Sequence, residues 1–109
     1  MEPIVLLGTT TVGASLWAVM RYHRCVDVTW ELADDRAVIL DARGSTLTTL
    51  NPVGTLIWHY LDIAREPDEV AGHLLERFPG VDPGRAHRDA KAFIDRLVDD
   101  GLLVPAGES

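Results

Sequence analysis

Two side chains that could perform covalent chemistry lie close together near the start of the chain, His23 and Cys25. A thiol becomes a strong nucleophile when a neighbouring base lowers its pKa, and residues two apart on a strand share one face. However, no Asn or Asp is evidently placed to orient the histidine, and a lone cysteine usually packs as a small apolar group. The sequence therefore favours a protein that is not an enzyme.

The remaining histidines, His59, His73 and His87, each fall in a different predicted helix. Metal sites often show spacings such as His-x-x-x-His or Cys-x-x-Cys, and the sequence has neither. The paired carboxylates Asp34-Asp35 and Asp99-Asp100 fall at a predicted turn and a helix end, where contact with solvent is their usual role. We therefore expect surface histidines, no metal and no cofactor.

The overall charge limits the classes of partner. The chain has 109 residues, enough for one domain, and a formal net charge of −7 at pH 7. Nucleic-acid binding draws much of its affinity from Lys and Arg side chains that neutralise phosphates, so the composition argues against a nucleic-acid partner. The single cysteine, Cys25, excludes an internal disulfide and fits a reducing compartment, so we expect a cytoplasmic protein.

The first twenty residues leave several alternatives open. Residues 3–20 carry no charged side chain, and their length touches the lower limit of a membrane span. Their many Thr and Gly residues, and the absence of a preceding Lys or Arg, argue against a membrane helix or a signal sequence. An extra strand, a poorly ordered extension, a membrane tether and a natural start at Met20 all stay as alternatives.

The middle of the chain has the pattern of a small β-meander. Apolar and polar residues alternate over Val26–Leu32, which is typical of a half-buried strand. Residues 33–36 predict a turn, residues 37–40 a second strand and residues 41–44 another turn. A third strand is expected over Ser45–Leu50, so that three antiparallel strands precede the helical part.

Three helices are expected after the meander. Asn51 is a favourable N-cap for a helix that begins at Pro52, Pro67 opens the second helix, and Asp82 caps the third. Gly101 ends the last helix. Apolar residues recur at helical spacing in all three, at positions 53, 56, 57, 60, 61, 70, 74, 75, 78, 86, 90, 93, 94, 97 and 98. The predicted fold class is α+β, a three-stranded antiparallel meander followed by three helices.

The segment from Leu40 to Leu61 resembles the middle of PqqD-like proteins. It contains Leu-Asp with a Gly three residues later, then Leu-Asn before a helix, then Gly and Ile-Trp. The resemblance continues to the last helix, which runs into Gly101-Leu102-Leu103, and covers roughly residues 26–104. A departure lies at Thr46–Thr49, where lasso-peptide members commonly have an aromatic residue, so the class of natural product stays open.

This resemblance implies a winged-helix-like RiPP recognition element. Such a module binds the leader of a ribosomally made precursor as a strand, against the third strand and beside the last helix, and hands it to a leader peptidase, cyclase or other modifying enzyme. No reaction is catalysed by the module itself, and lasso-peptide systems are favoured. The peptide-binding residues implied here are Thr46, Leu47, Thr48, Thr49, Leu50, Arg88, Lys91, Ala92, Asp95 and Asp99.

Each of these assignments also has a purely structural interpretation. The five helix positions also fit a solvated helix face, and the strand positions also fit an ordinary edge strand blunted by threonines. A winged-helix DNA-binding regulator is the alternative function, although the chain has no basic recognition helix. We expect a peptide-binding domain over residues 21–105, preceded by the uncertain extension 1–20 and followed by a short tail, 106–109.

Overall fold

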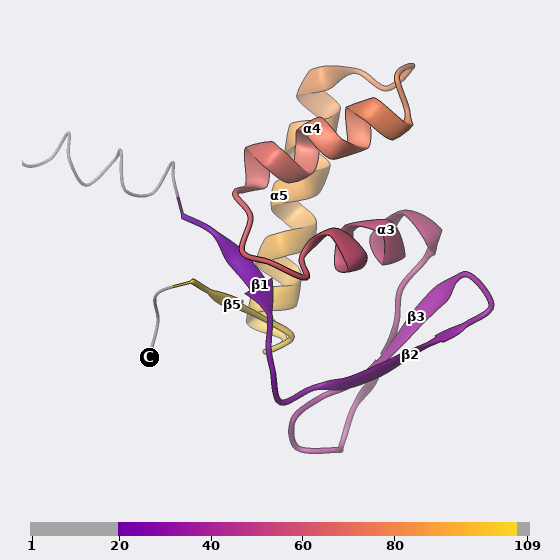
Figure 1. Ribbon diagram of the computed structural model, residues 1–109, viewed down its shortest axis with the longest axis vertical. Helices are drawn as coiled ribbons and strands as arrows, with labels where there is room; N and C mark the ends of the chain where they lie inside the picture. The colour runs from indigo at the N-terminus through magenta and orange to yellow at the C-terminus, as the bar shows by residue number, and fades with distance from the viewer. Residues whose placement is uncertain (1–19, 107–109) are drawn as a thin grey trace, which may run out of the picture.

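The computed structural model describes residues 20–106, and the alternatives for the segment before Met20 lie outside that range. It confirms the predicted α+β class, with an antiparallel three-stranded sheet and three helices (Figure 1). No helix in the described range is long and apolar enough to cross a membrane. The elements in chain order are β1 (Tyr22–Arg24), β2 (Thr29–Ala33), β3 (Arg36–Leu40), β4 (Leu47–Thr49), α3 (Pro52–Tyr60), α4 (Pro67–Arg77), α5 (Pro83–Asp99) and β5 (Leu103–Pro105).

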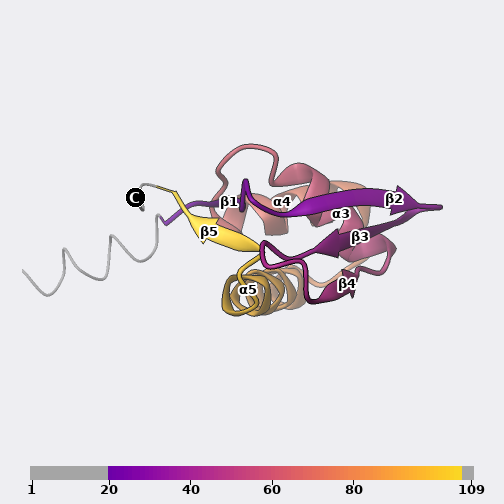
Figure 2. The same ribbon diagram turned by 90° about the horizontal axis from the view of Figure 1, so that it is seen from below.

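The main sheet has the order β2-β3-β4, with Ile39 of β3 opposite both Trp30 and Thr48. Strand β2 begins later than the alternation predicted, because Val26 lies in a turn and is 87% exposed. Figure 2 shows the strands stepping from β2 on one side of the molecule to β4 on the other, where α5 is seen end-on.

A second sheet, of strands β1 and β5, was not predicted. It pairs His23 with Val104, so that the two ends of the described chain lie together. Each strand has only three residues, and their pairing joins positions about eighty residues apart, so local periodicity carries no signal for it. The predicted order, with every strand before the helices, is therefore incomplete because β5 follows α5.

The helix boundaries follow the capping residues that predicted them. The Asn51 side chain accepts a hydrogen bond from the Gly54 amide at 2.7 Å, and the Asp82 carboxylate accepts one from the Arg85 amide at 3.0 Å. Gly101 adopts a φ of 77° at the end of α5, a conformation in which a side chain would be strained. These caps fix where α3 and α5 begin, and so fix the walls of the site described below.

The core lies between the helices and the inner face of the main sheet. Trp58 is fully buried, and its indole N–H has no acceptor among the described residues. The buried Thr55 hydroxyl accepts a hydrogen bond from the Ala37 amide at 2.8 Å and fastens α3 to β3. Two positions of the predicted apolar stripes are exposed, Val53 at 44% and Phe78 at 41%, because the first turn of α3 and the end of α4 border an open groove.

Candidate functional site

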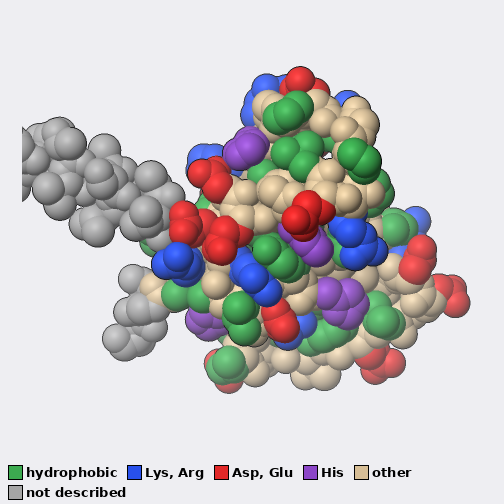
Figure 3. All heavy atoms as spheres, turned by 45° about the horizontal axis from the view of Figure 1, so that its top comes forward, with side chains coloured by type: hydrophobic (Ala, Val, Ile, Leu, Met, Phe, Trp, Pro, Cys, Tyr) green, Lys and Arg blue, Asp and Glu red, His purple; other side chains and the backbone are tan. Residues whose placement is uncertain are grey.

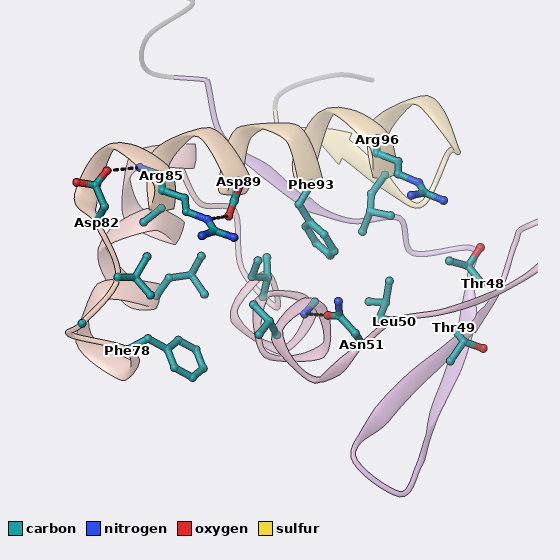
Figure 4. Close-up of a pocket in the computed structure, with 18 residues that line it drawn as sticks. Thr48, Thr49, Leu50, Asn51, Phe78, Asp82, Arg85, Asp89, Phe93 and Arg96 are labelled. Carbon is teal, nitrogen blue, oxygen red and sulfur yellow. Dashed lines mark hydrogen bonds and ion pairs between the residues drawn. The ribbon is translucent and has the colours of Figure 1, made fainter.

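A groove of about 820 Å³ runs between β4 and α5 and is closed at one end by the start of α3 and the α4–α5 connection (Figure 4). The strand side contributes Thr48, Thr49 and Leu50. Helix α5 contributes a row of side chains along its length, Arg85, Ala86, Asp89, Phe93, Arg96 and Leu97. The site thus joins two elements that lie more than thirty residues apart in the sequence.

Within residues 20–106, the outer edge of β4 faces this groove with backbone groups that pair with no other strand. Asp41 and Thr46 are joined by a backbone hydrogen bond of 3.1 Å, and so are Ala37 and Leu50, at 2.9 Å. Because hydrogen-bonded pairs alternate along an antiparallel ladder, Thr48 bonds to β3 whereas Leu47 and Thr49 point their amides and carbonyls outward. Those two residues can pair with an additional strand.

The far end of the groove is apolar. Val53 from α3, Phe78 from the end of α4 and Val81 from the α4–α5 connection are all large, exposed side chains that line it. The buried side chains of Ile57 and Leu74 lie beneath them. Exposed apolar clusters of this kind mark binding sites for apolar groups of a ligand or partner.

Gly54 and Phe93 shape the middle of the groove. Figure 4 shows the Phe93 ring projecting from α5 toward Asn51 at the start of α3. A Cβ atom on Gly54 would lie 3.0 Å from Cε1 of Phe93 and 3.2 Å from the Asn51 side-chain oxygen. The glycine therefore permits the close approach of α3 and α5.

The charges along the groove are mostly balanced by neighbours on α5. Arg85 lies 3.5 Å from Asp89, and Arg96 lies 4.0 Å from Asp100, each pair four residues apart on the helix. Exposed pairs of this type contribute little to stability. The groove can therefore accept an extended peptide without burying a charge that lacks a partner.

A second hollow, of about 460 Å³, lies beside the start of β4 and is lined by Asp41, Thr46, Leu47 and the Arg96–Asp100 pair, among others. The Asp41 carboxylate accepts hydrogen bonds from the Ser45 amide at 2.8 Å and the Thr46 amide at 3.3 Å. These bonds, with that of the Ser45 amide largest, lower the pKa of Asp41 below its ordinary value. The charged carboxylate thus holds the β3–β4 turn at the entrance to the groove.

The structure brings only part of the predicted site together. Thr48, Thr49 and Leu50 line the groove, and Thr46 and Leu47 line the neighbouring hollow. The five predicted helix positions line neither space: Arg88, Lys91, Ala92, Asp95 and Asp99. They lie on a face of α5 turned roughly 120° from the groove row, where Lys91 and Asp95 form an exposed ion pair of 3.3 Å.

Sequence reasoning missed the groove row of α5. Phe93 was assigned wholly to the core, but it is only partly buried. Arg85, Asp89 and Arg96 also line the groove but are not among the predicted peptide-binding residues. The available signal was their spacing, since these residues recur at three and four positions next to the buried stripe of Ala86, Ala90 and Ile94 and so border the core.

The groups considered for chemistry are not gathered at the groove, whose lining contains no His or Cys. His23 lies on β1, where its Nδ1 is 2.9 Å from the Arg24 carbonyl oxygen. His59 and His87 are exposed, as predicted, whereas His73 is partly buried and stacks on Tyr60 with ring centroids 4.0 Å apart. Within residues 20–106 no cluster of three or more His, Cys, Asp or Glu side chains could hold a metal ion.

Comparison with known proteins decides the family. Residues 36–103 match the sequence profile of coenzyme PQQ synthesis protein D (PqqD). The chain belongs to the PqqD family. The match runs from β3 to the start of β5 and so includes both walls of the groove. It confirms the relationship that the Leu40–Leu61 segment suggested.

Two solved structures are similar to this PqqD-family chain over most of its length. One is described as TbiB1 in complex with the TbiA(beta) leader peptide; it has 26% sequence identity and a TM-score of 0.68, and the match covers 80% of this chain and 98% of that one. The other is lasso peptide synthetase B1 complexed with the leader peptide, with 26% identity, a TM-score of 0.66, and coverage of 77% and 98%. A search of curated proteins gave no match.

Proposed function

We propose that this chain binds the leader segment of a ribosomally synthesised precursor peptide as a strand added to β4, and delivers it to a processing enzyme. The observation that carries the proposal is the groove beside a free sheet edge in a member of the PqqD family. Both similar solved structures are described as complexes with a leader peptide, and one is a lasso peptide synthetase component, so a lasso-type pathway is the favoured setting.

The groove offers two kinds of interaction to an extended peptide. The outward backbone groups of Leu47 and Thr49 supply sequence-independent pairing. Because β4 has only three residues, this pairing is short, and the apolar end around Phe78 and Val81 must supply further affinity. Side chains of the added strand alternate between the groove and the opposite side, so the apolar end also selects the register.

The proposed role is binding, not catalysis. The groove lining supplies backbone groups, apolar side chains and paired charges, with no nucleophile and base in contact. Delivery of a leader requires no cofactor, and the chemistry falls to the partner, a leader peptidase, cyclase or other modifying enzyme. We place the peptide-binding domain at residues 21–105, between the extension 1–20 and the tail 106–109, and the protein in the cytoplasm, where ribosomal precursors are made.

The test is fluorescence polarisation with labelled leader peptides from precursor genes next to the gene of this chain. Scrambled leaders of the same composition and a duplex DNA serve as controls. Binding of one leader but not of its scrambled form supports the proposal. Salt-sensitive binding of the DNA, with no leader bound, would support the winged-helix regulator instead and overturn the proposal.

The two faces of α5 need a separate test. We propose that the row containing Phe93 and Arg96 contacts the leader, since it lines the groove. The row of Arg88, Lys91, Ala92, Asp95 and Asp99 stays a prediction from the resemblance. Phe93→Ala and Lys91→Ala should separate the rows by their leader affinities. A loss confined to Lys91→Ala would favour the outer row and move the leader away from the groove.

A further inference from the structure

Arg24, the last residue of β1, lines neither the groove nor the neighbouring hollow. Its guanidinium carbon lies 5.2 Å from the centre of the Trp30 ring and 5.8 Å from that of Trp58. The Arg24 amide also donates a 3.3 Å hydrogen bond to the Leu61 carbonyl, which holds β1 against the end of α3. The side chain is therefore partly buried and fixed on two aromatic rings.

This cation has no carboxylate within 4 Å among the described residues, although the chain carries a net charge of −7. Its two arginine neighbours differ: Arg21 pairs with Glu66 at 2.9 Å, and Arg65 lies 3.7 Å from Asp62. A fixed guanidinium still presents several N–H donors in a planar fork, and a carboxylate fits that geometry best. The Arg24 guanidinium can therefore form an ion pair with a carboxylate of a partner molecule.

Two tryptophans pack on Arg24, and exposed apolar residues lie a few positions along the chain from its neighbours. The Trp30 ring lies edge-on to His59 at 5.3 Å and to Trp58 at 6.0 Å. Val26 follows β1 by two residues, Ile63 follows the hydrogen-bonded Leu61 by two, and Leu32 shares the face of β2 that carries Trp30. The described residues include seven large exposed hydrophobic side chains. Three of them are Val26, Leu32 and Ile63, and three others line the groove.

We call Arg24, Val26, Trp30, Leu32, His59 and Ile63 the Arg24 patch. Figure 3 shows one face of the molecule, on which hydrophobic, His, basic and acidic side chains lie next to one another. Trp and Arg are the residues most enriched at energetic hot spots of protein interfaces. Several large apolar side chains around one cation suit a protein surface better than a small free anion, which would need converging polar donors.

We infer that the Arg24 patch is the docking surface for the enzyme that processes the leader-bound precursor, and that the enzyme contributes a carboxylate which pairs with Arg24. This inference rests on the proposed leader-binding function. A leader on β4 occupies one edge of the sheet and the groove beside it, so an enzyme that acts on the same peptide needs a contact elsewhere on the module. The patch includes Trp30 and Leu32 of β2, which forms the opposite edge of the sheet.

The test measures two affinities on the same full-length protein. The first is for the labelled leader, and the second, by biolayer interferometry, is for the purified processing enzyme encoded beside this chain. Arg24→Glu should weaken enzyme binding at least tenfold and leave leader affinity within twofold. Arg43→Glu makes the same charge change at an exposed position in the β3–β4 turn and should alter neither. Enzyme binding by the wild type should also weaken as salt is raised.

A second variant keeps the test valid if Arg24→Glu does not fold. Ile63→Ser replaces a side chain that is 58% exposed, so the fold should tolerate it, and it should weaken enzyme binding by about fivefold. Unchanged enzyme affinity in folded variants would overturn the inference. So would a wild-type dimer in analytical ultracentrifugation that Arg24→Glu dissolves, because the occupant would then be a second copy. If the wild type does not bind the leader at all, the proposed function itself is rejected.

Discussion

The two edges of the main sheet expose backbone groups in the same way but have different surroundings. Leu47 and Thr49 point their amides and carbonyls outward on β4, and the same alternation leaves Trp30 and Leu32 outward on β2. Across from β4 lies α5, with a row of side chains that forms a groove, whereas β2 is flanked by the Arg24 patch. A free edge is therefore not enough to define a peptide site.

The two edges differ in the side chains that surround them and that would contact an added strand. At β4 the facing helix offers an apolar compartment at one end and charged pairs along its length, which we propose select one register of a bound peptide. At β2 the hairpin ends in Asp34-Asp35, and Glu31 lies within the strand. Charged residues at an edge discourage pairing with another strand. We therefore propose peptide binding at one edge and protein docking at the other.

The largest expected loss of leader affinity comes from replacing a residue of β4 that has an outward amide with proline. Thr49→Pro removes a donor to the leader but leaves the hydrogen bonds between β3 and β4 intact. The leader carbonyl it would have paired then lacks a partner, which costs about 1–3 kcal/mol, or roughly 5- to 150-fold in affinity. Fluorescence polarisation with the labelled leader measures the loss.

The matched control is Leu32→Pro, which removes an outward amide from β2. It should leave leader affinity within twofold. Equal losses in the two proline variants would break the comparison, because they would mean that the effect comes from the stability of the sheet and not from the identity of the edge.

The apolar end of the groove should give the next largest effect. Phe78 is exposed and lines the groove, so Phe78→Ser removes apolar area that a leader would cover. At about 25 cal/mol per Å² of buried apolar surface the expected cost is about 1 kcal/mol, or roughly fivefold in leader affinity. Ile63→Ser, on the Arg24 patch, should leave leader affinity unchanged. If Ile63→Ser weakened the leader as much as Phe78→Ser, the two surfaces would not be distinct.

A smaller effect is expected where α3 and α5 approach each other. In Gly54→Ala the new methyl group would lie 3.0 Å from Phe93, so the ring must shift and narrow the groove. We expect leader affinity to fall by about two- to fivefold, while the higher helix propensity of alanine, about 1 kcal/mol, offsets the cost to folding. Gly72→Ala in α4 adds a methyl group into open space and should change stability only. A Gly54→Ala variant with wild-type affinity would show that Phe93 does not shape the leader path.

The sequence predicted the elements of the groove better than their detailed roles. Asn51, Pro67 and Asp82 act locally, through a side-chain hydrogen bond or a fixed φ, so the starts of the three helices could be predicted from neighbouring residues. The third strand was also predicted, and with it the residues of β4 that line the groove.

The rest depends on contacts between distant segments. Which face of α5 meets β4 is set by the packing of Phe93 against Gly54 and by the buried stripe, and a helical pattern alone does not distinguish the two flanks of that stripe. The β1–β5 pair depends on a similarly distant contact. The position of Arg24 also depends on a distant contact. Its amide bonds to the Leu61 carbonyl at the end of α3, and this holds β1 where the Arg24 side chain reaches the Trp58 ring.

The smallest expected effect concerns the turns that lead to the two edges. The β3–β4 turn is held by the Asp41 carboxylate through the Ser45 and Thr46 amides, which lower the Asp41 pKa. Because the folded pKa is depressed, this stabilisation is complete above the unfolded value of about 3.9 and is lost as pH falls through the lower folded value. NMR titration of the Ser45 and Thr46 amides should therefore show a midpoint below 3.9. Asp41→Asn should weaken the leader by less than about twofold, and Asp35→Asn, at the β2–β3 turn, not at all. An amide midpoint above 3.9 would mean that Asp41 does not order the turn, and the difference between the two edges would then rest on α5 alone.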